Sequence, residues 1–488
     1  MAALCGLGGA GKTSVAVEYA YRHLATLGVV WQFPADEPAA LAAGFGDLAI
    51  ELGARDPLAA GDPVARVHGM LAVRREDWLL IFDNAPGLAA LQGVLPPAGH
   101  GRVLITSQNP HWPGDQAVDV PVLDQDVAAA FLLVRTGSAD EGAARDLAAE
   151  LGGLPLALEQ GAAYMLATGR GIADYLAVFR QRRTDLLARG EPTGYGQQVA
   201  TTWTLAFDQL RQTAPLAVGL LRLLACCAPD QIPVRLLLRP HPGLADPLPM
   251  ELAVLLGDPL AADDAIAALR AFSLDRGSSP QDGLVSVHRL VQAVTLDQLS
   301  ADQTESWRQA ARSLIEAVLP GDAEQPGNWP VFAALLPHAQ ATLPADGDGM
   351  ARIARFLGNS GNHGAARALQ QQITEAREQV LGAEHPGTLT ARANLAHWTA
   401  QAGDPAAARD QFAALLPARE RVSGAEHPST LTARANLARW TGRAGDPVAA
   451  RDQFAALLPA RERVSGAEHP ETLNARVELA YWTRRAEH

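Results

Sequence analysis

Residues 6–14 read GLGGAGKTS and match the phosphate-loop pattern G-x-x-x-x-G-K-[ST]. Such a loop needs a buried strand before it and a helix after it, because backbone N–H groups and the helix N-terminus must face the same anion. The apolar residues 2–5 and the helix-forming residues 15–24 meet both needs. The sequence therefore predicts a parallel α/β domain at the N-terminus that holds a phosphate group.

Lys12 is the only lysine of the chain, although lysine and arginine together number 40. A composition that uses arginine everywhere else keeps lysine where a compact ammonium on a thin stem is needed. We expect Lys12 to reach the β- and γ-phosphates of ATP or ADP, and Thr13 to bind Mg²⁺. The loop glycines turn backbone N–H groups towards the phosphates. The predicted nucleotide-binding residues of the loop are Gly6, Gly8, Gly9, Ala10, Gly11, Lys12, Thr13 and Ser14.

Two further apolar runs predict strands beside the loop. Residues 78–82 are apolar on both alternating faces, as in an interior strand of a parallel sheet, and Asp83 follows them. We predict that Asp83 is the second group that organises magnesium, although a helix N-cap would read the same way. The run at residues 101–110 contains Thr106 and Ser107, whose hydroxyls are candidates for contact with the γ-phosphate. For Ser107, ordinary turn chemistry is an equal alternative.

Length and composition limit the classes of protein to consider. The chain has 488 residues, which at about 100–200 residues per domain suggests three or four domains. A formal net charge of −13 argues against a general nucleic-acid-binding surface. The three cysteines have no metal-ligand spacing, and no apolar run reaches the ~18 residues that a membrane span needs. We therefore expect a cytoplasmic protein without a membrane span and without a general nucleic-acid-binding surface, while a local basic face on one domain stays open.

The C-terminal part contains an internal repeat. The letters GAEHP recur at Gly382, Gly424 and Gly466, at a constant spacing of 42 residues. Each unit reads as two helices, and Asp404 and Pro405 suit the N-cap and the first position of a second helix. Stacked helix pairs form a solenoid with an extended binding surface. We therefore predict that the repeats bind a protein or peptide ligand.

Each repeat also carries a histidine before a proline, at His385, His427 and His469. Histidines at equal spacing suggest a metal site. However, they occupy the same turn of units that stack along one axis, so we do not expect them to meet at one ion.

Between the phosphate loop and the repeats the chain reads mostly helical. Residues 126–183 include Gly-Leu-Pro-Leu, in which Pro155 ends one helix and starts the next. Residues 199–299 alternate helical stretches with a short β-branched segment at 285–287, which is typical of a winged-helix domain. His288 follows this segment, and by itself it reads as an ordinary core or surface histidine.

The phosphate loop, LLIFDNA, ITSQNP, GLPLAL and VHRLVQ, in this order and spacing, resemble the motifs of STAND-class signal-transduction ATPases with an NB-ARC module. Many bacterial members join that module to tetratricopeptide repeats. The 42-residue units are similar to the kinesin-light-chain type of that repeat. The resemblance implies that Pro155 lies against the adenine side of the nucleotide. It also implies that His288 reaches the β-phosphate of bound ADP and holds a closed state.

The resemblance predicts a multidomain protein with an α/β P-loop NTPase core and an all-α C-terminal solenoid. Because the loop starts at residue 6 and the last repeat is incomplete, both ends look truncated. The predicted parts are the nucleotide-binding α/β domain at 1–124, a helical domain with the GLPL motif at 125–195, a winged-helix domain at 196–300, a helical connector at 301–345 and tetratricopeptide repeats at 346–488.

Two positions depart from the family pattern. Asn84 stands where a second acid often follows the magnesium aspartate, and Gln108 stands where an arginine often follows Thr-Ser. An amide neither acts as a general base nor neutralises the charge of the γ-phosphate. We therefore expect at most slow ATP hydrolysis and assign no catalytic residue.

Three functions fit the sequence. In the first, the chain is a switch that ADP holds closed, that a ligand on the repeats loosens, and that assembles into a homo-oligomer after exchange for ATP. The second is a transcriptional regulator of the antibiotic-activator STAND type, although those carry a DNA-binding domain before the phosphate loop. The third is a peptide-binding scaffold with an inactive nucleotide site, against which the retention of Lys12 counts.

Overall fold

The computed structural model describes residues 1–54, 62–97, 99–113, 116–188, 195–241, 244, 248–275 and 283–487. The chain divides into two compact units, each with its own internal packing. The first unit comprises Met1–Asp36, Arg74–Pro320 and Pro330–Leu343, and the second comprises Glu37–Val73, Gly321–Trp329 and Pro344–His488.

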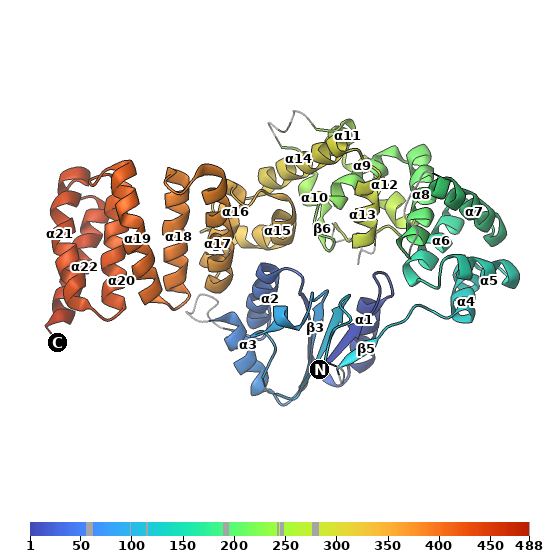
Figure 1. Ribbon diagram of the computed structural model, residues 1–488, viewed down its shortest axis with the longest axis horizontal. Coiled ribbons are helices and arrows are strands. Elements are labelled where there is room, and N and C mark those ends of the chain that lie inside the picture. Colours follow the sequence, from blue (N-terminus) through green and yellow to red (C-terminus); the bar gives the residue numbers. More distant parts are fainter. Residues whose placement is uncertain are drawn as a thin grey trace. The chain divides into compact units, whose positions relative to one another are not determined.

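A parallel five-stranded sheet carries the N-terminal part of the first unit, as predicted (Figure 1). The strand order is β2-β3-β4-β1-β5, so the strand before the phosphate loop has neighbours on both sides. Helix α1 (Lys12–His23) packs against β1, β3 and β4. The strands are β1 (Ala2–Cys5), β2 (Leu27–Pro34), β3 (Asp77–Asp83), β4 (Gly101–Ser107) and β5 (Ala117–Asp119).

The interior strand β3 explains why the sheet forms here. Trp78 to Asp83 are all buried in β3, which has β2 and β4 as its neighbouring strands and α1 packed against it. Val30 and Leu80 lie on adjoining strands, and the register of β2 with β3 places Pro34 opposite Asp83. Parallel strands end at the same edge, so the residues after β1, β2, β3 and β4 meet there.

Helices make up the rest of the first unit. Helix α9 (Pro215–Ala225) is buried along most of its length and packs against α8, α11, α12, α13 and α14. A two-stranded antiparallel ladder, β6 (Ile232–Pro233) with β7 (Leu284–Val285), lies in the same group. The other helices are α4 (Gln125–Thr136), α5 (Glu141–Glu150), α6 (Pro155–Thr168), α7 (Ile172–Ala188), α8 (Tyr195–Thr213), α10 (Val234–Leu237), α11 (Met250–Gly257), α12 (Pro259–Ala271), α13 (Arg289–Asp297), α14 (Ala301–Val318) and α15 (Trp329–Thr342).

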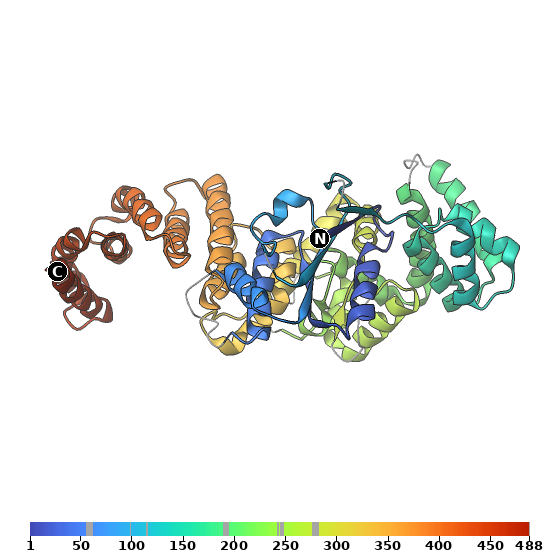
Figure 2. The ribbon, with the colours of Figure 1, turned by 90° about the horizontal axis from the view of Figure 1, so that it is seen from below.

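The second unit is a stack of antiparallel helix pairs, which confirms the predicted repeat region. Neighbouring helices lie side by side from α16 to α22, and Figure 2 shows several of the last ones nearly end-on. Helix α2 packs against α17, where Gly46 meets Asn362. Among the described helices, none has the length and apolarity needed to cross a membrane. The helices are α2 (Pro38–Glu51), α3 (Pro63–Ala72), α16 (Asp348–Asn359), α17 (His363–Leu381), α18 (Pro386–Gln401), α19 (Pro405–Ser423), α20 (Pro428–Arg443), α21 (Pro447–Ser465) and α22 (Pro470–Ala486).

The repeat histidines are helix caps, a role that the sequence analysis missed. His385 accepts a hydrogen bond at Nδ1 from the backbone N–H of Gly387 at 3.1 Å, at the start of α18. His427 and His469 make the equivalent contact at α20 and α22. The first N–H groups of a helix have no partner inside the helix, and these rings satisfy one of them each time.

Asp404 caps α19, as predicted, and its replacement tests how much the caps stabilise the solenoid. Its carboxylate accepts from the backbone N–H of Ala407 at 2.9 Å. We expect Asp404→Ala to cost about 1 kcal/mol and to lower the midpoint of thermal unfolding. Asp410 lies on the same helix with its side chain 68% exposed, and Asp410→Ala removes the same charge without removing a cap. Equal midpoints for the two variants in a circular-dichroism melt would contradict the capping role.

Candidate nucleotide-binding site

The phosphate loop has the backbone conformation that only glycine adopts without strain. Gly6, Gly9 and Gly11 have φ values of 148°, 81° and 92°. At Gly6 a β-carbon would also lie 2.6 Å from the carbonyl oxygen of Val120. Gly11 is the N-cap of α1 and offers no side chain there, so the first N–H groups of the helix stay available to an anion.

Lys12 is held inside the loop that it belongs to. Its ammonium donates to the carbonyl oxygens of Gly6 and Leu7, both at 2.8 Å, and the residue is only 7% exposed. Burial lowers the pKa of Lys12, while the nearby carboxylate of Asp83 opposes that shift. The carboxylate thus favours the charged ammonium in a place where burial alone would disfavour it.

Asp83 lies at the centre of a cluster at the carboxyl edge of the sheet. Thr13 donates its hydroxyl to Asp83 Oδ1 at 2.8 Å, so the two predicted magnesium ligands are neighbours. Thr106 donates to the same oxygen, and Gln32 Nε2 donates to Oδ2 at 3.3 Å. A hydroxyl and a carboxylate side by side beside a phosphate loop are a donor set that suits Mg²⁺, which takes oxygen ligands and completes its shell with phosphates and water.

Gln32 and Thr106 are the members of this cluster whose contact with Asp83 the sequence analysis missed. Gln32 is the polar residue near the end of β2, paired in register with Ile81 of β3. The sequence feature that points to Gln32 is its position: it is a polar residue near the end of an apolar strand, and the neighbouring strand ends in Asp83. Thr106 was considered only as a phosphate contact, but its hydroxyl also accepts from the backbone N–H of Asn84 at 2.9 Å.

Ser107 is fully buried at the end of β4. Its hydroxyl donates to the carbonyl oxygen of Ala85 at 2.7 Å and accepts from the backbone N–H of Asn109 at 3.1 Å. The bond to Ala85 joins the ends of β3 and β4, and the bond from Asn109 lies within the turn after β4, which corresponds to the turn-chemistry alternative. A contact between Ser107 and a phosphate stays a prediction. The next residue, Gln108, lies beside the loop, with its amide 3.8 Å from where a β-carbon on Gly8 would be.

The GLPL segment also comes to the phosphate loop. Pro155 is the first residue of α6, as predicted, and Leu156 donates its backbone N–H to the carbonyl oxygen of Gly9 at 3.4 Å. The Leu156 side chain covers Gly9 closely, because a β-carbon there would lie 3.1 Å from Leu156 Cβ. The structure thus brings Pro155 next to the loop, while its contact with adenine stays a prediction.

His288 caps α13, and its neighbour ties that helix to the sheet. The ring accepts at Nδ1 from the backbone N–H of Leu290 at 3.1 Å. Arg289 forms an ion pair with Asp36, two residues after the end of β2. Ala35, next to Asp36, donates its backbone N–H to the carbonyl oxygen of Asp83 at 2.8 Å. The start of α13 is therefore anchored at the carboxyl edge that carries Asp83, and a contact of His288 with phosphate stays a prediction.

Family models match three stretches of the chain. Two models described as tetratricopeptide repeat match residues 349–421 and 430–471. A third, described as a domain of unknown function (DUF7779), matches residues 206–304, which hold α9 to α13 and the β6–β7 ladder.

Two relatives of this chain are longer proteins. A nucleotide-binding leucine-rich repeat (NLR)-like protein of the fungus Hyaloscypha variabilis is 26% identical over 79% of this chain and 42% of its own length. The regulatory protein AfsR of Streptomyces coelicolor is 29% identical over 46% of this chain and 24% of its own length. The chain thus spans less than half of either relative.

A solved STAND protein with a tetratricopeptide repeat sensor from Pyrococcus horikoshii aligns over 99% of this chain and 78% of that one. The two chains are 11% identical, and the alignment has a TM-score of 0.42.

Proposed function

We propose that this chain, whose resemblance to STAND-class ATPases with C-terminal tetratricopeptide repeats is confirmed, is a nucleotide-dependent switch. ADP holds a closed state, a ligand on the repeats loosens it, and exchange for ATP permits assembly into a homo-oligomer. The observation that carries the proposal is the contact of Thr13 with Asp83 beside the loop that holds Lys12. A ligand shifts such an equilibrium only by its different affinity for the two states.

The residues of the loop bind the nucleotide in this proposal. Lys12 and the backbone N–H groups of residues 6–14 bind the phosphates, and Thr13 and Asp83 hold Mg²⁺. The ion, when bound, neutralises phosphate charge. Gln32 and Thr106 orient the Asp83 carboxylate through the hydrogen bonds that they donate to it.

The helical groups around α6 and α9 supply the closed state. We assign residues 196–300 to a winged-helix domain, supported by the helices around α9 and the antiparallel β6–β7 ladder. His288 is the latch on ADP. The Arg289–Asp36 ion pair supports this, because it holds the start of α13 at the edge of the sheet. In this proposal the nucleotide-binding domain ends at residue 124, the helical domain at 195, the winged-helix domain at 300 and the connector at 345.

Hydrolysis is at most slow, and the nucleotide acts by its presence. Asn84 follows Asp83 with φ of 61°, and its amide supplies no general base. Gln108 lies beside Gly8 but carries no charge for the γ-phosphate. The protein works in the cytoplasm, and its repeats bind a polypeptide.

The direct test is to denature the purified chain and identify the released nucleotide by chromatography. We expect close to one ADP per chain. A protein that is empty and also fails to bind added ATP and ADP would contradict the switch and leave the repeat scaffold with an inactive nucleotide site.

The similarity to AfsR, which is named a regulatory protein, favours transcriptional regulation as a second candidate. This function requires DNA binding, directly or through further segments. A gel-shift assay with duplex DNA distinguishes it, because specific binding through phosphate contacts weakens steeply as salt rises.

A further inference from the structure

Three arginines occupy equivalent positions on the second helices of consecutive repeats. Arg377 of α17, Arg419 of α19 and Arg461 of α21 are separated by the 42-residue period of the chain. Arg419 and Arg461 are 6% and 2% exposed. A buried guanidinium is costly unless an acid and hydrogen-bond acceptors surround it.

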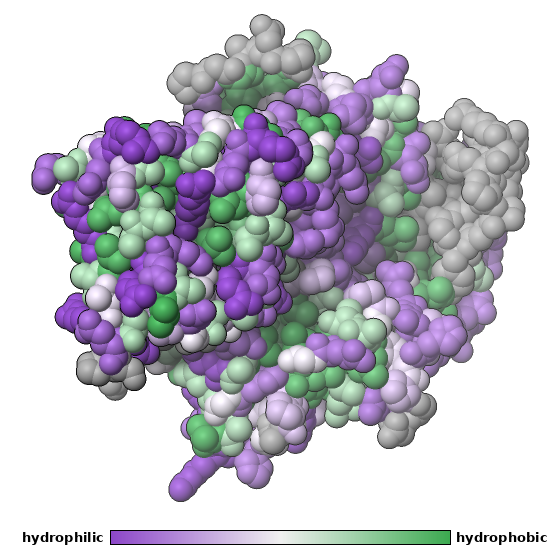
Figure 3. All heavy atoms as spheres, turned by 60° about the vertical axis from the view of Figure 1, so that its left-hand side comes forward, coloured by the Kyte–Doolittle hydropathy of each residue, from purple (hydrophilic) through white to green (hydrophobic). Residues whose placement is uncertain are grey.

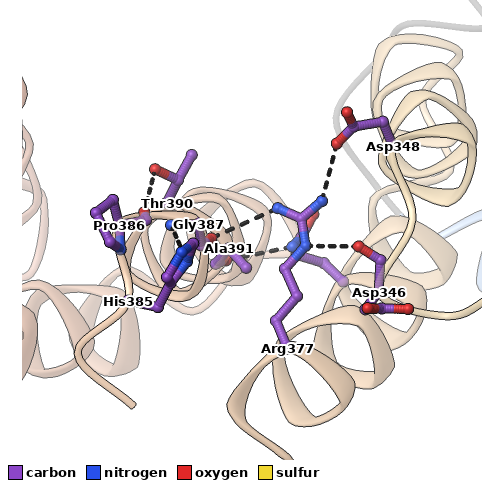
Figure 4. A network of polar contacts seen from close by, with 9 residues as sticks. Asp346, Asp348, Arg377, His385, Pro386, Gly387, Thr390 and Ala391 are labelled. Carbon is purple, nitrogen blue, oxygen red and sulfur yellow. Dashed lines mark hydrogen bonds and ion pairs between the residues drawn. The ribbon is translucent and has the colours of Figure 1, made fainter. Parts of the chain in front are cut away.

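Arg377 has a full set of partners (Figure 4). It forms an ion pair with Asp348 at 3.1 Å, and its Nε donates to the carbonyl oxygen of Asp346 at 2.9 Å. A third contact reaches the carbonyl oxygen of Gly387. The charge at the first of the three positions is therefore compensated within the chain.

Arg461 is compensated in a different way. It forms an ion pair with Glu471, in the first turn of α22, and it donates to the hydroxyl of Thr432 at 2.9 Å. Glu471 is the residue that follows the His-Pro of its repeat. The carboxylate that compensates the charge of Arg461 thus belongs to a residue in the first turn of the neighbouring helix α22.

Arg419 lacks this acid, because Ser429 occupies the position that Glu471 has in the next repeat. Arg419 donates to the hydroxyl of Thr390 at 3.2 Å, the counterpart of the Thr432 contact. Its buried Nε has no partner, and neither has that of Arg461, so the missing carboxylate is what distinguishes the two positions. Within the described part of the chain Arg419 forms no ion pair. Burial accordingly lowers the pKa of Arg419.

The Arg419 side chain lines a groove of about 390 Å³ between α18, α19 and α20. Amides and hydroxyls surround it, and these can pair with the backbone of a peptide. Figure 3 shows that hydrophilic and hydrophobic side chains are interspersed on the face of the repeats that it presents. The polar lining residues used here are Thr390, Asn394, Ser429, Thr432 and Asn436.

The other charged groups near the groove do not replace the missing acid. Arg439 is already paired with Glu478 at 2.8 Å. Burial lowers the pKa of His397, and Arg439 lowers it further, so this ring is neutral at neutral pH. The groove therefore presents one uncompensated positive charge among neutral polar groups.

We propose that the groove between α18, α19 and α20 binds an acidic segment of a partner polypeptide, whose carboxylate pairs with Arg419 as Glu471 pairs with Arg461. Asn394 and Asn436 bind the backbone of that segment. The inference deepens the proposed function, since it gives the chemistry of the ligand that the repeats sense. Charge-assisted pairing of a guanidinium with a carboxylate supplies both affinity and orientation.

The test measures binding of fluorescein-labelled hexaglutamate to the full chain by anisotropy, with hexaglutamine as the neutral probe. Saturating MgADP occupies the phosphate loop, and a Lys12→Ala chain repeats the measurement without that anion site. Ser429→Glu supplies the missing acid from within the chain. We expect it to weaken hexaglutamate binding about tenfold or more, while Glu471→Ser opens a second site and raises the number bound.

Two matched variants separate the site from general effects. Ser429→Gln has the length of glutamate without its charge, and Ala383→Glu adds the same charge at an exposed turn. Both should bind hexaglutamate within about threefold of the unaltered chain. Equal loss in Ser429→Gln and Ser429→Glu, or no binding by the unaltered chain, would overturn the site. If hexaglutamate binds but the rate of ADP release does not change, the acidic-segment site is supported and the proposed switch is wrong.

Discussion

Lys12→Ala should lower the affinity for MgADP by at least ~100-fold, equivalent to about 3 kcal/mol. The variant removes the only ammonium of the loop, which now donates to the carbonyl oxygens of Gly6 and Leu7 at 2.8 Å. These oxygens hold the side chain across the loop, where phosphates are proposed to bind. A hydrogen bond to a charged group contributes about 1.5–3 kcal/mol, so the loss of the ammonium's contact with the β-phosphate of ADP accounts for the effect. Isothermal titration calorimetry measures it.

Lys12→Arg is the informative companion, because it keeps the charge. The planar fork of arginine is wider than an ammonium and does not fit a residue that is 7% exposed under a glycine loop. We expect it to bind MgADP nearly as poorly as Lys12→Ala. Normal affinity in the arginine variant would show that charge alone is needed. It would also remove the explanation for a single lysine in a chain with arginine everywhere else.

Replacing His288 should accelerate ADP release at least ~10-fold, because a charge-assisted hydrogen bond to phosphate is worth about 1.5–3 kcal/mol. The ring also caps α13, through the 3.1 Å contact with the backbone N–H of Leu290. His288→Ala would therefore remove a cap and a latch together. His288→Asn keeps a good N-cap and loses the imidazole. We expect the asparagine variant to melt near the unaltered chain and to release a fluorescent ADP analogue rapidly in stopped-flow experiments.

The Asp36–Arg289 pair gives an independent measure of the same latch. Each single reversal, Asp36→Arg or Arg289→Asp, places like charges together and should speed ADP release. The side chains are 25% and 42% exposed, so the effect is modest, about threefold to fivefold. The double reversal should restore slow release. If His288→Asn and both single reversals release ADP at the rate of the unaltered chain, α13 does not hold the nucleotide.

Local patterns predicted several elements at or near their final bounds. The strand at residues 2–5 and the interior strand that ends in Asp83 follow from short apolar runs, and the start of α6 follows from Pro155. Asp404 caps its helix as predicted. These signals are readable because each depends on residues within a few positions of one another.

Other features were not predictable in the same way. Gln32 and Thr106 join Asp83 from strands 51 and 23 residues away, and that convergence depends on the strand order. The sequence analysis considered the repeat histidines only as metal ligands, and it did not expect them to meet at one ion. It missed their role as helix caps, which the geometry of each turn shows.

By itself, the sequence determined the phosphate loop, the period of the repeats and the starts of α6 and α19, because glycine conformation, capping and apolar periodicity act over short stretches of chain. The tertiary structure alone decided which buried arginine lies in contact with a carboxylate. Arg461 is paired with Glu471 of the next helix, and only the fold shows that the residue after the His-Pro, which is Ser429 one repeat earlier, is the one that faces this arginine position. Compensation of a buried charge depends on contact across helices, and contact is a property of the folded chain.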